Sequence, residues 1–451
     1  MELLFERALL PDGIARRVAV RIADDGTLRT IATDVQSSAA LVVRGLAVSG
    51  MPNLHSHAFQ RGMAGAAEVS AAADNSFWGW RETMYRFVER LRPEDVAAIA
   101  AMAYVEMLEA GYTAVAEFHY LHHQPDGSPY PDRTAMAVAV RAAAQQAGIR
   151  QLLLPCLYQV SGFGPRPLLE RQRRFALATD QFLRLFAQLR AQSTPLHTIG
   201  VALHSLRAVP MASLRDTVAS LPANLPVHIH ICEQQREVDE CLKFVGRRPI
   251  EYLLDSVALS PRWCLVHATH AQPSELNAVV QAGAVIGLCP TTEANLGDGR
   301  FALDDFVDLS GRFGIGSDSQ VSIDPCEELR TAEYALRLHK QRRGLVSVGS
   351  QGHCGTALYT LASAGGAQAL GIQAGELSVG KLADIVVLDT GRPQFAGLPD
   401  EALMDAHVFA PRPGAVRDVM VAGQWVVRDG RHVQREPVSR AYQRSVQALL
   451  R

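Results

Sequence analysis

The 451-residue sequence lacks the cysteine pattern of a disulfide framework or a cysteine-rich zinc site. Its seven cysteines are scattered, odd in number and never spaced as C-x-x-C, so we expect free thiols and a cytoplasmic location. It also lacks any run of eighteen apolar residues without charge, which argues against a membrane span. The opening stretch MELLFERALLPDG contains acidic residues and no small-residue cleavage site, so we expect no signal peptide.

An excess of charge of either sign is absent as well. The formal net charge is -2, which gives no indication of a nucleic acid or an anionic membrane as partner. No G-x-G-x-x-G or Walker pattern follows an expected strand, so we expect no phosphate-binding loop. Apolar residues make up 48% of the chain, enough for the core of a large α/β barrel with a smaller second domain.

The two ends of the chain share a strand-like rhythm. Residues 1–48 and 376–435 alternate apolar and polar residues in short pieces separated by the turn sequences DDG and RDG. Because chain termini often lie close together, we predict one small β-sandwich subdomain built from both ends. Residues 49–375 then form the central domain, and residues 436–451 a C-terminal helix.

The central domain alternates short apolar runs with longer helical patterns such as RPEDVAAIAAMAYVEMLEAG. The apolar runs number eight: GLAVSGMPNLHSH, YTAVAEFHY, RQLLLPCLY, HTIGVALHS, LPVHIHICE, RWCLVHATH, GAVIGLCP and RFGIGSDS. Strands that alternate with helices indicate βαβ units and a parallel sheet. Eight such units predict an α/β fold of the (β/α)8 TIM-barrel type.

Most of these runs end in residues that can bind a metal or transfer a proton. The residues are His55, His57, Glu117, His119, Tyr120, His204, His230, Glu233, His267 and Asp318. In a barrel, the carboxyl ends of all strands meet at one face, where active sites lie. Such side chains are costly beside buried strands unless they are paired, liganded or functional, so we predict that they form one site.

The chemistry of this set favours a zinc ion. His55 and His57 lie two residues apart, so on a strand their rings point the same way. Imidazoles with a carboxylate and no thiolate suit a divalent ion such as zinc, and the candidates are His55, His57, His230, His267 and Asp318. The residues alone do not divide these into ligands and neighbours. Glu233, three residues beyond His230, is a candidate general acid/base.

These motifs resemble the amidohydrolase superfamily across almost the whole chain. The H-x-H pair, the histidines of the fifth and sixth runs, GSD in the eighth run and LSVGKLADIVVLD near the C-terminus carry the resemblance. MPNLHSHAFQRGMAG, FWGWRETMYRF, VHIHICEQ, LVHATH and GLCPTTEANLGDG are similar to one deiminase subgroup of that superfamily. The resemblance implies a (β/α)8 barrel and a hydrolase acting on the C–N bond of an amidine.

The resemblance also implies roles for the metal and its neighbours. One Zn2+ per subunit would be held by His55, His57, His230 and Asp318, with His267 orienting the attacking water and Asp318 helping to take its proton. Binuclear members bridge two ions with a carboxylated lysine on the fourth strand, whereas the fourth run here, IGVALHS, contains no lysine. Glu233 would act as the proton shuttle while a metal-bound hydroxide attacks the substrate.

The subgroup implies a small substrate with two carboxylates. N-formimino-L-glutamate would be hydrolysed to N-formyl-L-glutamate and ammonia, a step of histidine degradation. By resemblance, the side-chain carboxylate is held by Arg207, His204 and Tyr120, and the α-carboxylate by Gln60 and Arg81. Arginine suits this task because its planar guanidinium binds carboxylates through two hydrogen bonds. The resemblance further implies a homodimer.

Alternatives remain at this stage. A deaminase of a heterocyclic amine could use the same barrel, and a catalytically inert barrel is a third possibility. His119, His122 and His123 are interpreted as loop or pocket-wall residues, and His228 as a packing residue or a neighbour of the ligands rather than a ligand. Gln320 stands where the family pattern has histidine. This departure affects the expected details of the pocket near Asp318 but not the expected metal site.

Overall fold

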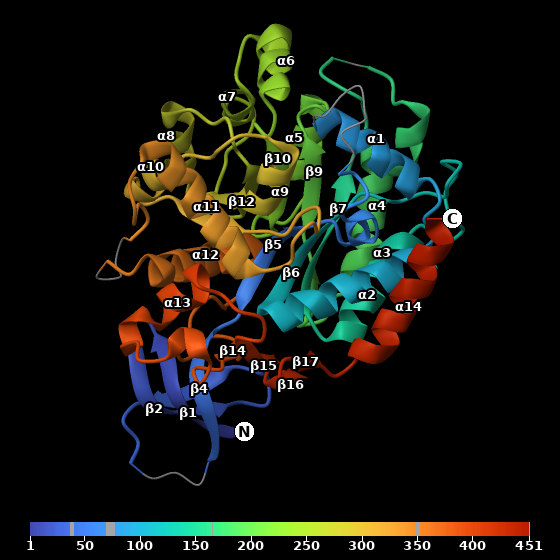
Figure 1. The fold of residues 1–451 in the computed structure, drawn as a ribbon. Helices are drawn as coiled ribbons and strands as arrows, with labels where there is room; N and C mark the ends of the chain where they lie inside the picture. The colour runs from blue at the N-terminus through green and yellow to red at the C-terminus, as the bar shows by residue number, and fades with distance from the viewer. Residues whose placement is uncertain (37–39, 69–76, 165, 348–351, 451) are drawn as a thin grey trace.

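The structure is a computed structural model that describes residues 1–36, 40–68, 77–164, 166–347 and 352–450 (Figure 1). Eight parallel strands in these ranges form a closed barrel: β5 (Met51–Ser56), β6 (Tyr112–His119), β7 (Arg150–Leu157), β9 (Val201–Ser205), β10 (Val227–Ile231), β11 (Trp263–His267), β12 (Val285–Leu288) and β13 (Arg312–Ile315). Pairing of β6 with β7 and of β13 with β5 closes the ring, and β8 (His197–Ile199) adds to β7. All eight predicted runs form barrel strands, so the predicted barrel is confirmed.

Helices surround the barrel, as its sequence pattern predicts. They are α1 (Phe77–Val88), α2 (Pro93–Ala110), α3 (Ala135–Ala147), α4 (Thr179–Arg190), α5 (Met211–Ala219), α6 (Gln235–Val245), α7 (Pro249–Leu254), α8 (Pro273–Ala282), α9 (Pro290–Leu296), α10 (Leu303–Asp308), α11 (Pro325–Lys340), α12 (Cys354–Leu370), α13 (Leu403–Phe409) and α14 (Arg435–Leu449). Short 3-10 helices occur at η1 (Ala58–Met63), η2 (Glu170–Phe175), η3 (Pro393–Phe395) and η4 (Asp400–Ala402). The barrel strands are apolar along their length because helices cover one face and the barrel core the other, and every residue of β6, β7, β10 and β11 is buried.

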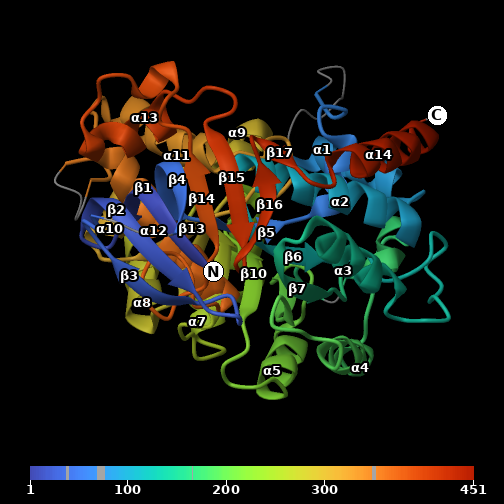
Figure 2. The same cartoon turned by 90° about the horizontal axis from the view of Figure 1, so that it is seen from below.

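A second sheet combines the two ends of the chain. Its strands are β1 (Glu2–Leu10), β2 (Gly13–Ile22), β3 (Leu28–Ala32), β4 (Leu41–Ser49), β14 (Ile385–Leu388), β15 (Val416–Val421), β16 (Gln424–Arg428) and β17 (Arg431–His432), in the order β17-β16-β15-β14-β4-β1-β2-β3. N-terminal β4 pairs antiparallel with C-terminal β14, so blue and red strands lie side by side in Figure 2. Buried residues of this sheet form a separate apolar core, while alternate residues of β4 and β14 belong to the main core.

The structure also tests the expectations of free cysteines and of no membrane-spanning helix. All seven cysteines lie in the described ranges, where each is buried and free. Among the residues that the structure describes, none of the helices combines the length and the apolar character that a bilayer crossing requires. The C-terminal helix α14 lies alongside α2 on the outside of the barrel (Figures 1 and 2).

Candidate active site

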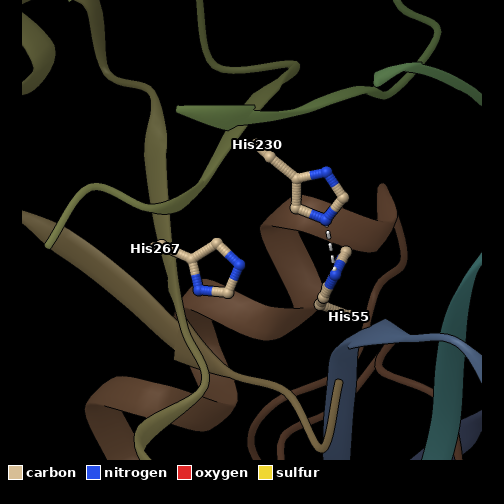
Figure 3. A group of neighbouring side chains, drawn as sticks. All are labelled: His55, His230 and His267. Carbon is tan, nitrogen blue, oxygen red and sulfur yellow. Dashed lines mark hydrogen bonds between the residues drawn. The ribbon is translucent and has the colours of Figure 1, made fainter. Parts of the chain in front are cut away.

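The carboxyl ends of three barrel strands bring four predicted ligands to one point. His55 is the penultimate residue of β5 with His57 just beyond the strand, His230 lies in β10, and Asp318 follows β13. The Nε2 atoms of His55 and His230 are 3.0 Å apart (Figure 3). Asp318 Oδ1 lies 3.3 Å from His55 Nε2 and 3.5 Å from His57 Nε2. Residues separated by more than 250 positions in the chain therefore present their donor atoms to a single centre.

The spacing of these atoms fits a divalent ion. A tetrahedral zinc ion with bonds of about 2.0–2.1 Å places its ligand atoms about 3.3 Å apart, close to the separations found. His57 Nδ1 donates to Phe118 O (2.8 Å) and His230 Nδ1 to His204 O (2.9 Å). These bonds leave both Nε2 lone pairs free for a metal, the usual arrangement for a ligating histidine. The donor set and its outer hydrogen bonds thus fit zinc.

The charge states at this centre also suit metal binding. Burial lowers the pKa of His55 to about 3 and lowers the pKa values of His57 and His230, so all three imidazoles are neutral. Burial alone would raise the pKa of Asp318, but the hydrogen bond with His55 and the electrostatic influence of the surrounding His55, His267 and His57 rings bring it below its usual range. Neutral imidazoles and an ionised carboxylate are the metal-binding forms of these groups.

His267 lies beside this centre and is surrounded by carboxylates. Its Nε2 is 3.8 Å from Glu233 Oε1 and 3.9 Å from Asp318 Oδ2, and its Nδ1 is 3.3 Å from Glu293 Oε1. Burial opposes a charge here, but the three carboxylates outweigh it and raise the pKa of His267 to about 10. A protonated imidazole donates from both nitrogens. This state suits a residue that orients water or substrate, and the His267 ring lies beside that of His230 and nearly parallel to it (Figure 3).

The predicted substrate-binding residues line one pocket above this centre. The pocket wall includes Gln60, Arg81, Tyr120, His204 and Arg207, together with His57, His230, Glu233, His267 and Asp318. Gln60 Nε2 donates to Tyr120 OH at 3.1 Å. Arg81, on α1, stacks over the Trp78 ring at 4.3 Å. Arg207 Nη2 donates to Glu233 Oε2 at 3.2 Å. The structure therefore brings all the predicted site residues together, with His55 buried beneath the pocket.

Strained backbone positions several of these side chains. Cys232, His267 and Asp318 have φ values of 52°, 71° and 45°, a left-handed conformation that costs non-glycine residues energy and is common at active sites. Gly316, two residues before Asp318, packs against the His55 main chain. A Cβ at position 316 would lie 2.7 Å from His55 O. The glycine of the GSD motif thus allows β13 to approach β5.

Two buried glutamates near the site were missed in the sequence. Glu293 accepts the Cys289 N–H at 2.9 Å and contacts His267, and Glu237 accepts the Glu233 N–H at 3.2 Å. Each glutamate lies four residues after the strand-end residue whose N–H it binds. An acidic residue at this spacing after a strand is a signal that could have identified both, although helices often begin with exposed acids.

The remaining strand-end candidates lie outside the pocket or make hydrogen bonds that hold neighbouring segments in place. Glu117 accepts from Ser56 Oγ (2.7 Å) and Ala58 N (2.8 Å), which holds the turn after β5. Neither Glu117 nor His119 lines the pocket. The other histidines bond main-chain carbonyls: His122 to Cys156 O (2.8 Å), His123 to Ala176 O (2.6 Å) and His228 to Ala369 O (2.9 Å).

Gln320, which departs from the family pattern, lies in a buried polar network next to the predicted metal ligands. Its Nε2 donates to Ser56 Oγ (3.0 Å) and Asp318 O (2.9 Å), and its Oε1 accepts from Ser317 Oγ (2.8 Å). The side chain is fully buried. The amide therefore links the ends of β5 and β13 without lining the pocket.

This barrel, with its histidine and aspartate centre at the carboxyl ends of the strands, is of the metal-dependent hydrolase type. The amidohydrolase family matches residues 46–426, and the chain belongs to this family. It is 50% identical over 446 residues to the formimidoylglutamate deiminase of Pseudomonas aeruginosa, which covers 99% of this chain and 98% of that protein.

Two solved structures are similar over the whole chain. An amidohydrolase from Brucella melitensis has a TM-score of 0.94 and 43% identity, with 100% of both chains covered. An adenosine deaminase from Xanthomonas campestris with bound zinc has a TM-score of 0.83 and 20% identity, with 100% of this chain and 98% of that chain covered. At this lower identity the likeness shows the shared fold alone.

Proposed function

We propose that this chain is a zinc-dependent deiminase that hydrolyses N-formimino-L-glutamate to N-formyl-L-glutamate and ammonia. The observation that carries the proposal is the 50% identity, over 99% of the chain, to a formimidoylglutamate deiminase. The same region contains the complete set of His and Asp donors and the pocket above them. The function therefore rests on similarity along the whole sequence and not on the barrel alone, which hosts many chemistries.

Two cationic side chains in the pocket support a substrate with two carboxylates. Arg81 and Arg207 both line it, and the Nε atom of each is buried without a hydrogen-bond partner among the described residues. Buried guanidinium groups with free donors are suited to carboxylates. In the proposed complex, Arg207 with His204 and Tyr120 binds the side-chain carboxylate, and Gln60 with Arg81 binds the α-carboxylate. A flat heterocyclic amine would offer no carboxylate to the free Nε donors of Arg81 and Arg207.

The proposed reaction adds water across the C=N bond of the formimino group. Bound at His55, His57, His230 and Asp318, zinc would supply a water that is acidic at neutral pH and a Lewis acid for the C=N group. Glu233, whose carboxylate lies at the pocket wall, accepts a proton from water and delivers it to the imino nitrogen. The C–N bond to that nitrogen then breaks. The nitrogen leaves as ammonia with both water protons, and the oxygen remains in the formyl group.

His267 and Asp318 assist these proton movements in the proposed mechanism. The raised pKa of His267 keeps a positive charge beside Glu233, with His267 Nε2 at 3.8 Å from Glu233 Oε1. His267 also donates a hydrogen bond that orients the water or the substrate. Asp318 shares the water's proton while it holds the ion.

Several finer features belong to the same proposal. One zinc per subunit is supported by a single four-donor centre and by the absence of lysine from β9, Val201–Ser205. A homodimer rests on the family resemblance alone, and a cytoplasmic location rests on the free cysteines. Metal analysis of the purified protein, light scattering and cell fractionation test these three features separately.

A substrate comparison tests the function directly. We expect ammonia and N-formyl-L-glutamate in equal amounts from N-formimino-L-glutamate, and no ammonia from guanine or adenosine. N-formiminoglycine, which lacks the second carboxylate, is the matched control and should show a much lower kcat/KM. Ammonia release from a purine but not from the formimino compound would contradict the proposal and favour the heterocyclic alternative. Protein that binds zinc but is inactive on every substrate would favour the inert barrel.

A further inference from the structure

The carboxylate of Glu237 is buried at the junction between β10 and α6. It lies in the first turn of α6 and has no exposed surface. Its Oε1 accepts the Cys232 N–H at 3.3 Å, and its Oε2 accepts the Glu233 N–H at 3.2 Å. Cys232 has a φ of 52°, so this turn bends sharply just before Glu233. Glu237 therefore holds the main chain that carries the proposed proton shuttle.

The same carboxylate also faces Arg207. Arg207 Nε lies 3.8 Å from Glu237 Oε2, while Arg207 Nη2 donates to Glu233 Oε2 at 3.2 Å. Burial opposes the charge of Arg207, but the carboxylates of Glu237 and then Glu233 more than compensate and raise its pKa. One guanidinium thus lies between two carboxylates that come from one turn of chain.

The two carboxylates differ in their freedom to move. Glu237 is fully buried and bound to two main-chain N–H groups, so it is a fixed partner of the guanidinium. Glu233 lines the pocket and binds Arg207 through a single hydrogen bond. When a substrate carboxylate takes up donors of Arg207, Glu233 can give up its bond while Glu237 keeps the guanidinium in place.

We propose that Glu237 is a positioning residue that holds Arg207 for the substrate carboxylate and Glu233 for proton transfer in one fixed arrangement. The proposal rests on the roles given above to Arg207 and Glu233. Glu237 itself does not line the pocket, so it acts through these two residues. Because a buried charge that loses its partner is strongly unfavourable, removing the Glu237 charge should let Arg207 turn toward Glu233 and away from the substrate.

The competing interpretation is that Glu237 only stabilises the start of α6. A purely structural residue would lower thermal stability without a specific effect on substrate carboxylate binding. Glu275 provides a matched control because it is also a buried glutamate in the first turn of a barrel helix, α8. It pairs with Arg248 (Nε to Oε2, 3.0 Å) and accepts the Gln272 N–H at 2.8 Å, but it contacts no pocket-lining residue that we describe.

A double-mutant cycle separates the two interpretations. Glu237→Gln keeps the shape and removes the charge. We expect it to raise KM for N-formimino-L-glutamate about tenfold or more, the size of a charged hydrogen bond, and to lower kcat as well. In an Arg207→Ala background the same change should alter KM less than about twofold, because interacting residues are not additive. Glu275→Gln should leave KM close to that of the wild type.

Each outcome bears on a different claim. An equal rise in KM in both backgrounds, or no larger a rise than with Glu275→Gln, would overturn the positioning role. A wild-type protein without activity on N-formimino-L-glutamate would instead refute the proposed function. If Glu237→Gln does not fold, as judged by circular dichroism and zinc content, Glu237→Asp retains the charge but withdraws it by one methylene. That variant should then show the same raised KM in the wild-type background only.

Discussion

His55 and Asp318 are joined by both main chain and side chain. The Asp318 N–H donates to His55 O at 3.0 Å, and Asp318 Oδ1 lies 3.3 Å from His55 Nε2. Asp318 follows β13 and His55 lies near the end of β5, which are the last and first strands of the barrel. The contact that closes the barrel is thus also the contact that assembles the proposed metal ligands, so zinc binding and barrel closure should depend on each other.

Gly316→Ala tests this dependence. The new Cβ would lie 2.7 Å from His55 Cβ and His55 O, too close for any real contact, so β13 must move and carry Asp318 away. We expect a lower zinc content after dialysis and a lower melting temperature. Elemental analysis and thermal unfolding measure these two effects. Gly391→Ala is the control, since its Cβ would meet only the Asp389 side chain at 3.3 Å. Full zinc content in Gly316→Ala would contradict the link.

Glu233→Gln should retain zinc but lose most of its turnover. The substitution removes the group that carries protons and leaves all four ligands in place. General acid/base catalysis contributes about 10²–10⁴-fold, and we expect kcat to fall by that factor. Steady-state kinetics with parallel metal analysis provide the measurement. Glu240→Gln, a change in a glutamate that pairs with Arg236 further along α6, should stay near wild-type rate. Near-normal turnover in Glu233→Gln would exclude the shuttle role.

Arg81→Ala and Arg207→Ala should each weaken binding of the dicarboxylate. Both remove a guanidinium from the pocket wall, and charged hydrogen bonds contribute roughly tenfold or more to affinity. We expect a higher KM or a lower kcat/KM for N-formimino-L-glutamate. Arg215→Ala, which removes an exposed arginine bonded to Ser256, serves as the control for lost charge. Unchanged kinetics in either variant would place that arginine outside the substrate site.

The barrel could be predicted from the sequence because its pattern is local. Each apolar run is short and bounded by turns or helices, and chemistry-bearing residues recur at the carboxyl end of the runs. That regularity is enough to place His55, His230 and Asp318 at one face. It does not require any knowledge of which strands are neighbours.

What could not be predicted depends on contacts between distant segments. Glu293 and Glu237 share their spacing after a strand with ordinary exposed acidic residues of a helix's first turn, so the spacing makes them candidates and the fold shows that they turn inward to strand ends. Gln320 is similar: its bonds to Ser56 and Ser317 exist only after β5 and β13 meet. The left-handed backbone at Asp318 is likewise imposed by that meeting and not by local preference.

His407 makes the stability of the protein depend on pH at a place remote from the active site. It lies on α13, is buried, and its Nδ1 has no partner among the described residues. Burial lowers the pKa of His407 to about 4 from its usual 6.5, so between these values the unfolded chain binds a proton that the folded chain excludes. Stability therefore rises with pH through this window and is lost as pH falls.

Between pH 7 and pH 5, this residue should remove about 2 kcal/mol from the free energy of unfolding. His407→Gln should reduce the difference between the free energies of unfolding at pH 7 and pH 5 by that amount. Any other effect of the substitution on stability should be the same at both pH values and does not change this difference. Chemical denaturation at the two pH values, with zinc in excess, gives the slope. His339→Gln is the control, because it replaces an exposed histidine on α11. An identical slope in His407→Gln and the wild type would show that the His407 ring is hydrated or paired in solution.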